Sequence, residues 1–273
     1  MKIKNLMTED LITIDKDQNL TDALKLMHKH KISRLPVLNA NHEHKKELVG
    51  IISERDIADK IGSAKFEKKP ISRIHVSSVM VKDIITVPED MDLIDVAKLM
   101  FDNGIGSVPV MDDENNLVGI VSKADFLTLA NGKAFDKLYV KDVMSKNITS
   151  VSPDERVVHA RRLMIDAKVG RLPVIENDKL VGMITYKDLI RAFLDIKKNV
   201  PENHQKVHLK ELLVDEIMTP NPLSANEYES VSKVDNLMIE TGFNGIPTIN
   251  DNNYVVGIIT QTDILGLLIE LES

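Results

Sequence analysis

Gly50-Ile-Ile-Ser53-Glu-Arg-Asp56 is one of four copies of a seven-residue pattern that decides the fold of this 273-residue chain. Each copy has a glycine, two apolar residues, a Ser or Thr, two variable residues and an Asp. The other copies are Gly119-Ile-Val-Ser122-Lys-Ala-Asp125, Gly182-Met-Ile-Thr185-Tyr-Lys-Asp188 and Gly257-Ile-Ile-Thr260-Gln-Thr-Asp263. A signal that recurs in this way indicates a repeat protein, in which one structural unit is copied along the chain.

A methionine and a proline keep step with the motif in every copy. The Met-to-Pro separation is 29 residues in all four copies, whereas the Pro-to-Gly separation is 14, 10, 9 and 10 residues. The excess in the first copy falls in the polar run 39–47, which predicts a longer surface turn. The landmark residues are Met7, Met80, Met144 and Met218, with Pro36, Pro109, Pro173 and Pro247. We expect the methionines to fill the core and the motif glycines to permit close packing of strands.

Apolar periodicity predicts the same elements in each unit. Leu20, Ala23, Leu24 and Met27 follow the i, i+3, i+4, i+7 spacing of an amphipathic helix, and the other units repeat this stripe. Residues 34–38 and 48–52 are typical of short strands, and residues 11–14 and 84–87 of a leading strand. A second helix is expected to begin at the motif Ser or Thr. Each unit is therefore β-α-β-β-α, and the fold is mixed α/β (α+β).

The units are expected to work in pairs. A unit of about 60 residues buries too little apolar surface to be stable alone, and two units can lay their sheets together. The methionine steps of 73, 64 and 74 residues indicate linkers at 59–77 and 195–210 and a boundary near Asn131-Gly132. We predict one domain over residues 1–132, with units at 1–62 and 74–132. The second domain covers residues 133–273, with units at 137–196 and 211–273.

Composition excludes several classes of protein. The net charge of -7 disfavours a nucleic-acid or anionic-membrane surface. The absence of cysteine excludes disulfides, thiolate catalysis and Cys-ligated zinc, and the eight histidines follow no metal-ligand spacing. We find no signal-peptide pattern and no apolar run near the ~18–20 residues that span a bilayer. We therefore expect a cytoplasmic protein without a metal site.

With these motifs in place, the chain resembles the tandem cystathionine beta-synthase (CBS) domain family over nearly its whole length. The resemblance implies two Bateman modules, each a pair of CBS motifs around a cleft that binds an adenosine-containing ligand. The four-motif layout is similar to the gamma subunit of AMP-activated protein kinase, which senses AMP, ADP and ATP.

The motif hydroxyl and carboxylate have two readings. A Ser or Thr before a helix caps it, which is worth about 1 kcal/mol, but the reciprocal capping box prefers Glu or Gln where all four units have Asp. A carboxylate beside a cleft can instead accept hydrogen bonds from ribose hydroxyls. The resemblance implies the ribose role for the Asp and a place near sugar or phosphate for the hydroxyl. The residues concerned are Ser53, Asp56, Ser122, Asp125, Thr185, Asp188, Thr260 and Asp263.

Basic residues distinguish the units. Arg34 and Arg171 precede Leu-Pro-Val in the first and third units, where the second and fourth have Ser107 and Gly245. Arginine suits phosphate because its planar fork donates two hydrogen bonds, and the resemblance implies phosphate contact here. Further candidates are Arg55 and Lys187 beside a helix start, and the hydroxyls Thr13, Thr86 and Ser150, each six residues after a repeat methionine. Each of these hydroxyls could contact a purine edge or simply form a turn.

The resulting hypothesis is a non-catalytic sensor that binds AMP, ADP or ATP between paired motifs and signals to a regulated protein. The expected partners are that protein and a second copy of the chain, without nucleic acid or membrane, and no cofactor is required. One alternative is a protein that binds S-adenosylmethionine or methylthioadenosine, which lack the phosphates that Arg34 and Arg171 would meet. Another is an interaction scaffold without a ligand. An enzyme is disfavoured because no acid-base, metal or nucleophile set converges.

Overall fold

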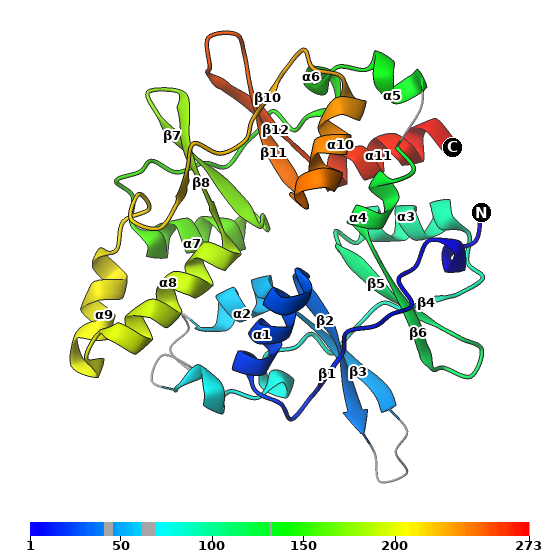
Figure 1. Cartoon of the computed structure of the whole chain (residues 1–273), viewed down its shortest axis with the longest axis horizontal. Coiled ribbons are helices and arrows are strands. Elements are labelled where there is room, and N and C mark those ends of the chain that lie inside the picture. Colours follow the sequence, from blue (N-terminus) through cyan, green and yellow to red (C-terminus); the bar gives the residue numbers. More distant parts are fainter. Residues whose placement is uncertain (41–45, 62–68, 131–132, 273) are drawn as a thin grey trace.

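The computed structural model describes residues 1–40, 46–61, 69–130 and 133–272. Four three-stranded sheets and their helices follow the four sequence units, which confirms the predicted mixed α/β fold (Figure 1). Three sequence predictions lie wholly or partly outside the described residues: most of the surface turn, at 41–45, the middle of the first linker, at 62–68, and the boundary between the halves, at 131–132.

The first helix of each unit begins where the apolar stripe begins. In α1, the Asn19 side chain accepts a hydrogen bond from the Asp22 N–H at 3.1 Å, which caps the helix one residue before the stripe. Leu20, Ala23 and Met27 are buried on one face, as their spacing predicts. The four helices are α1 (Leu20–His30), α3 (Leu93–Asp102), α7 (Val157–Asp166) and α10 (Val231–Thr241).

Two long antiparallel strands follow in each unit and set the register of the site. Arg34 lies opposite Ser53, and Arg171 lies opposite Thr185. In the first and third units, the residue before Leu-Pro-Val is therefore paired with the motif Ser or Thr. The first strands are β2 (Arg34–Ala40), β5 (Ser107–Met111), β7 (Arg171–Glu176) and β11 (Gly245–Ile249). Their partners are β3 (Lys46–Ser53), β6 (Leu117–Ser122), β8 (Lys179–Thr185) and β12 (Val255–Thr260).

The leading strands are shorter than predicted. Of residues 11–14, only Ile14 pairs with the sheet of its own unit. The reason is that the chain crosses between two sheets, because Thr8 bridges to Ile120 of the second unit before Ile14 pairs with Val37. The leading strands are β1 (Ile14–Asp15), β4 (Val87–Pro88) and β10 (Ala225–Asn226), and the third unit has a single bridge from Val151 to Val174.

A reciprocal exchange of methionines joins the first unit to the second and the third to the fourth. The motif glycine of each unit faces the repeat methionine of its partner so closely that an added Cβ would lie under 3.0 Å from the sulfur. The backbone of the exchanged segment also bonds to the partner sheet, for example Ile51 with Val81 and Ser145 with Ile258. In the fourth unit the segment forms a strand, β9 (Thr219–Pro220), beside β8. The facing pairs are Gly50 with Met80, Gly119 with Met7, Gly182 with Met218, and Gly257 with Met144.

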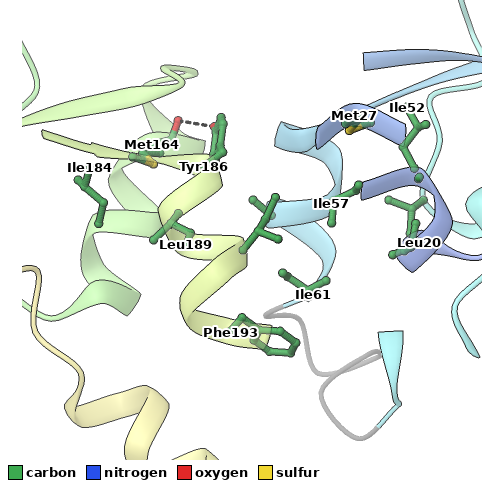
Figure 2. Close-up of a cluster of buried hydrophobic side chains, with 14 of the residues drawn as sticks. Leu20, Met27, Ile52, Ile57, Ile61, Met164, Ile184, Tyr186, Leu189 and Phe193 are labelled. Carbon is green, nitrogen blue, oxygen red and sulfur yellow. Dashed lines mark hydrogen bonds between the residues drawn. The ribbon is translucent and has the colours of Figure 1, made fainter. Parts of the chain in front are cut away.

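The second helix of each unit packs against helices from the other half of the chain, so each hydrophobic core includes residues of both halves. Helix α2 (Glu54–Ile61) packs on α8 (Tyr186–Asn199), and α11 (Gln261–Glu272) packs on α3 and on α4 (Lys123–Leu127). Figure 2 shows the first contact, where Ile61 of α2 lies near Phe193 of α8, while Ile57 lies on the side of α2 that faces Leu20 and Met27. One core therefore combines the first and third units, and another the second and fourth. The sequence predicted only the sheet pairing, and the division into domains at residue 132 stays a prediction.

The segments predicted as linkers are partly helical. The second one, residues 195–210, lies in α8 and α9 (Glu202–Glu211), which meet at Pro201. Proline lacks an N–H, so it ends one helix and starts the next, and the Gln205 amide donates to the Val200 carbonyl at 2.9 Å. The remaining short helices are η1 (Ile3–Asn5), η2 (Ile71–Arg73), η3 (Val76–Ser78), α5 (Lys133–Lys137) and α6 (Val140–Val143).

The four units form a ring in the order first, second, fourth, third (Figure 1). Sheet edges and methionines make two of the joints, and helices make the other two. Because one chain supplies all four units, the ring needs no second copy, and the expected dimer stays a prediction.

The methionine exchange can be tested at two glycines. Gly182→Ala should lower the free energy of unfolding by roughly 1–3 kcal/mol through overpacking. Since the three nearest atoms all belong to the Met218 side chain, Met218→Ala in the same chain should recover part of that loss. At Gly257 the Ser145 carbonyl oxygen is also 2.9 Å away, so Met144→Ala should recover less. Urea unfolding of the single and double variants measures the coupling between each glycine and its methionine. If the losses in unfolding free energy were additive at both sites, the methionine exchange would be contradicted.

Asp235 on α10 predicts a pH-dependent stability. Its side chain is 0% exposed, neither carboxylate oxygen has a hydrogen-bond partner among the described residues, and burial raises its pKa to about 7. A pKa above the unfolded value stabilises the fold fully below about pH 4, and this contribution is lost as pH rises to 7. Asp235→Asn should therefore flatten the fall in unfolding free energy between pH 5 and pH 8 by about 2 kcal/mol. The exposed control Asp166→Asn should leave the wild-type slope, and an unchanged slope in Asp235→Asn would refute the assignment.

Candidate functional site

The motif hydroxyl and carboxylate form the same local structure in all four units. The Ser or Thr side chain donates to Oδ2 of the motif Asp at 2.6–2.8 Å, and its backbone N–H donates to the same oxygen at 2.6–2.9 Å. This cap fixes the orientation of the carboxylate. It uses only one of the two oxygens, so capping and ligand binding do not compete.

The second carboxylate oxygen differs among the units. In Asp188, Oδ1 accepts from the Arg191 guanidinium at 2.8 Å, and in Asp263 it accepts from the Ser145 hydroxyl at 2.9 Å. Within the described part of the chain, no hydrogen bond reaches Oδ1 of Asp56 or Asp125. Four carboxylates that the motif makes alike are thus made unequal by their neighbours.

A cavity of about 1410 Å³ lies between the four units and gathers most of the predicted site. Nine of the fifteen predicted residues line it: Arg34, Ser53, Arg55, Asp56, Arg171, Thr185, Lys187, Asp188 and Thr260. Six do not: Thr13, Thr86, Ser122, Asp125, Ser150 and Asp263. The motif of the second unit is therefore set apart, because neither its hydroxyl nor its carboxylate reaches the cavity.

Two of the three predicted strand-end hydroxyls are replaced in the cavity wall by the residue before them. Ile85 lines the cavity where Thr86 does not, and Thr149 lines it where Ser150 does not. Successive side chains of an extended segment point to opposite sides, so a shift of one residue along the chain changes the face.

Apolar side chains of the second unit line the cavity beside the first motif, at the joint between the first and second units. Ile51 and Val81 exchange backbone hydrogen bonds of 3.0 and 2.9 Å, which brings residues 81–85 beside the first motif. Val81 is 42% exposed and Ile85 is 37% exposed, and both line the cavity. Exposed aliphatic side chains at a cavity wall form a surface on which a flat apolar group can bind.

The residues that line the cavity carry a net positive charge, although the net charge of the whole chain is negative. Eight lysines and arginines and five acidic residues line it, a balance of +3, while the whole chain has -7. A concave surface of one sign concentrates ligands of the opposite sign. The cations are Lys31, Arg34, Arg55, Lys123, Lys168, Arg171, Lys187 and Arg191, and the acids are Glu54, Asp56, Asp59, Asp83 and Asp188.

The two arginines found by sequence reach across the joint to the next unit. The Arg171 guanidinium donates to the Gly245 carbonyl at 2.9 Å, and burial lowers the Arg171 pKa to about 10, which leaves it charged at neutral pH. Arg34 reaches Gly106, where an added Cβ would lie 2.6 Å from a guanidinium nitrogen. Burial also lowers the Arg34 pKa, and the nearby carboxylates of Asp56 and Glu54 oppose that change. Each arginine therefore touches two units at once.

Sequence reasoning missed several cavity residues. Lys31 and Lys168 end the first helices with φ of 54° and 55°, where Gly104 and Gly242 stand in the other units. The signal was available, because all four residues lie 24 positions after a repeat methionine. Lysine rarely adopts this left-handed conformation, which is why glycine is usual there.

Glu54 is also a cavity residue that the motif pattern did not single out. Its carboxylate lies 3.9 Å from the Lys187 ammonium, across the contact between the first and third units. Burial raises the Glu54 pKa, and the charges of Lys187 and Arg34 oppose that rise. Lys187 is thus drawn toward an acid of the other half of the chain.

Two features are absent from the described residues, a metal-ligand cluster and a membrane-spanning helix. No group of three His, Asp or Glu side chains lies together as a metal site would require. No helix there combines the length and apolarity needed to cross a membrane.

Comparison with known proteins identifies the repeat. The CBS domain family matches residues 3–63, 76–132, 140–195 and 214–270, which correspond to the four units. The chain belongs to the CBS domain family. The ring is thus built from four CBS domains, and the cavity lies where all four meet.

Several relatives share the whole arrangement of CBS domains. Protein MJ1225 of Methanocaldococcus jannaschii is 26% identical over 274 residues, which cover 96% of this chain and 97% of that protein. Its crystal structure, described as that of a candidate archaeal homologue of γ-AMPK, is 24% identical and covers 98% of this chain and 100% of its own, with a TM-score of 0.85. A conserved Pyrococcus horikoshii protein, 22% identical, covers 98% of this chain and 100% of its own, with a TM-score of 0.65.

A further relative is longer than this chain. Protein MJ1404 of Methanocaldococcus jannaschii is 26% identical over 283 residues, and the match covers 99% of this chain but 62% of that protein. A chain of this length therefore matches a part of that longer protein.

Proposed function

We propose that this protein is a non-catalytic sensor that binds an adenine nucleotide in the cleft between its first and second units. The observation that carries the proposal is the positive cavity, whose lining combines an oriented carboxylate with apolar side chains and arginines. Adenine fits the wall of Val81 and Ile85, a ribose fits Asp56, and phosphates fit Arg34.

The Asp56 cleft is the strongest of the four. Of the motif carboxylates in the described chain, Asp56 alone both lines the cavity and has no hydrogen bond to Oδ1. At the third motif Arg191 occupies that oxygen, and at the fourth Ser145 does. A ribose hydroxyl could bind Asp56 without displacing a protein donor, which favours this cleft as the primary site.

Signalling is proposed to use the contacts between the halves of the chain. Lys187 of the third unit lies beside Glu54 of the first, and both face the cavity. A bound phosphate would compete with Glu54 for Lys187 and so change the balance of charge at the contact of α2 with α8. A ligand that favours one arrangement of this contact shifts the population toward it, and a partner protein can read the change.

Nucleotide binding should depend on Asp56 and not on Asp125. A nucleotide at 100 times its Kd would add about 2.7 kcal/mol of stability, or roughly 5–10 °C in Tm. Asp56→Asn should weaken binding about tenfold or more, because it removes a charge-assisted acceptor. Asp125→Asn is the matched control, since it alters the same cap outside the cavity, and should change Kd less than about twofold. Calorimetry with AMP, ADP and ATP on ligand-stripped protein measures this.

Equal loss in both Asp variants would contradict the assignment of the cleft. If S-adenosylmethionine or methylthioadenosine bound more tightly than AMP, ADP and ATP, the proposed ligand would be replaced. No response to any of these or to NAD would favour an interaction scaffold.

The arginines should respond to phosphate rather than to adenosine. Arg34→Ala is expected to weaken AMP and ATP binding by about tenfold, since it removes charged donors to phosphate in the proposed primary cleft, and Arg171→Ala should weaken any nucleotide binding between the third and fourth units. The Kd values of adenosine and S-adenosylmethionine should change less than about threefold. In the exposed control Arg162→Ala, the Kd values of all ligands should likewise change less than about threefold. Fluorescence or calorimetric titration gives the Kd values, and unchanged nucleotide binding would rule out phosphate contact.

A further inference from the structure

Lys123 is a buried cation without a carboxylate partner. It is the first residue of α4, its exposure is 9%, and its side chain lines the cavity. Its ammonium donates to the Thr262 hydroxyl at 2.8 Å, and no ion pair to Lys123 occurs among the described residues. The acid that acts on it electrostatically is Asp263, whose carboxylate is already held by Thr260 and Ser145. A buried charge that meets only a neutral hydroxyl is costly, so another group is needed to balance it.

A second cation approaches the same point from the first unit. Arg34 reaches Gly106, and the backbone N–H of Lys123 donates to the Gly106 carbonyl at 3.1 Å. Burial lowers the Lys123 pKa, and the charge of Arg34 lowers it further. In the described chain the Arg34 side chain makes no hydrogen bond or ion pair. The Arg34 guanidinium and the backbone of Lys123 therefore meet at one glycine, and the carboxylates of Asp56, Glu54 and Asp263 act on the two cations without forming an ion pair with either in the described chain.

An unpartnered hydroxyl completes the cluster. Ser107 follows Gly106, is 8% exposed and lines the cavity, and within the described ranges its Oγ has no hydrogen-bond partner. A buried hydroxyl left without a partner is unusual and points to a missing acceptor. Ser107 also occupies the position at which the first and third units have Arg34 and Arg171.

We propose that Lys123, Ser107 and Arg34 bind a phosphoryl group where the first, second and fourth units meet. Lys123 thereby replaces the arginine that the second unit lacks. For the identity of the ligand this inference rests on the proposed function: a nucleotide with its ribose at Asp56 would place its terminal phosphate here. The site would therefore distinguish ATP from AMP by the number of phosphates.

The test uses the full chain, stripped of ligand, with AMP, ATP and inorganic tripolyphosphate as probes in calorimetric titration. Lys123→Met should weaken ATP and tripolyphosphate by about tenfold or more, and AMP by less than about threefold. Without any anion, the same variant should melt at a higher temperature than wild type, because a buried unbalanced charge is removed. The matched control Lys25→Met, at a side chain that is 74% exposed on α1, should change neither.

Ser107→Ala provides a second variant with almost unchanged packing and should weaken ATP about three- to tenfold. Unchanged ATP and tripolyphosphate binding in both variants, or equal loss for AMP and ATP, would overturn the site. If tripolyphosphate bound through Lys123 while no adenine nucleotide bound, the site would stand and the proposed function would fail. If AMP bound through Asp56 without any effect of Lys123, the reverse would hold.

Discussion

The structure depends on the close contact between each motif glycine and the repeat methionine of the neighbouring unit. At Gly50 an added Cβ would lie 2.8 Å from both the Met80 sulfur and the Val81 carbonyl oxygen, so no larger residue fits without movement. The contact fixes the height at which the methionine segment crosses the partner strand. Because Asp56 follows Gly50 by six residues and Ile85 follows Met80 by five, it also fixes which residues face each other across the cleft.

The helices impose a second constraint, and the cavity follows from both. Sheet contacts join neighbours along the chain, but the α2 and α8 stripes are buried only when the first unit meets the third. Burial of apolar surface drives this contact, at roughly 25 cal/mol per Å². The two kinds of joint alternate around the ring (Figure 1). All four motif strands therefore end at its centre, where their variable residues meet.

Much of this fold is predictable from the sequence, because apolar periodicity and fixed spacing report local structure directly. The helix stripe from Leu20 to Met27 and the strand register are examples. The errors arise where the partner of a segment lies in another unit. Residues 11–14 have the composition of a strand, but the chain there spans two sheets. Lys123 was missed because it occupies a variable motif position, and only tertiary structure shows that Arg34 reaches Gly106, to which the Lys123 backbone N–H donates.

The repeat explains how four sites with one backbone geometry can differ in chemistry. In every unit, the residue after the motif hydroxyl donates its backbone N–H to a carbonyl oxygen. The carbonyl belongs to the residue immediately before β2, β5, β7 or β11. The backbone therefore places Glu54, Lys123, Tyr186 and Gln261 alike, although they are an acid, a base, a phenol and an amide. Since all four line one cavity, their differences sum there instead of acting at separate sites. An anion that enters the ring consequently meets one asymmetric field, which gives a single chain a preferred orientation for its ligand.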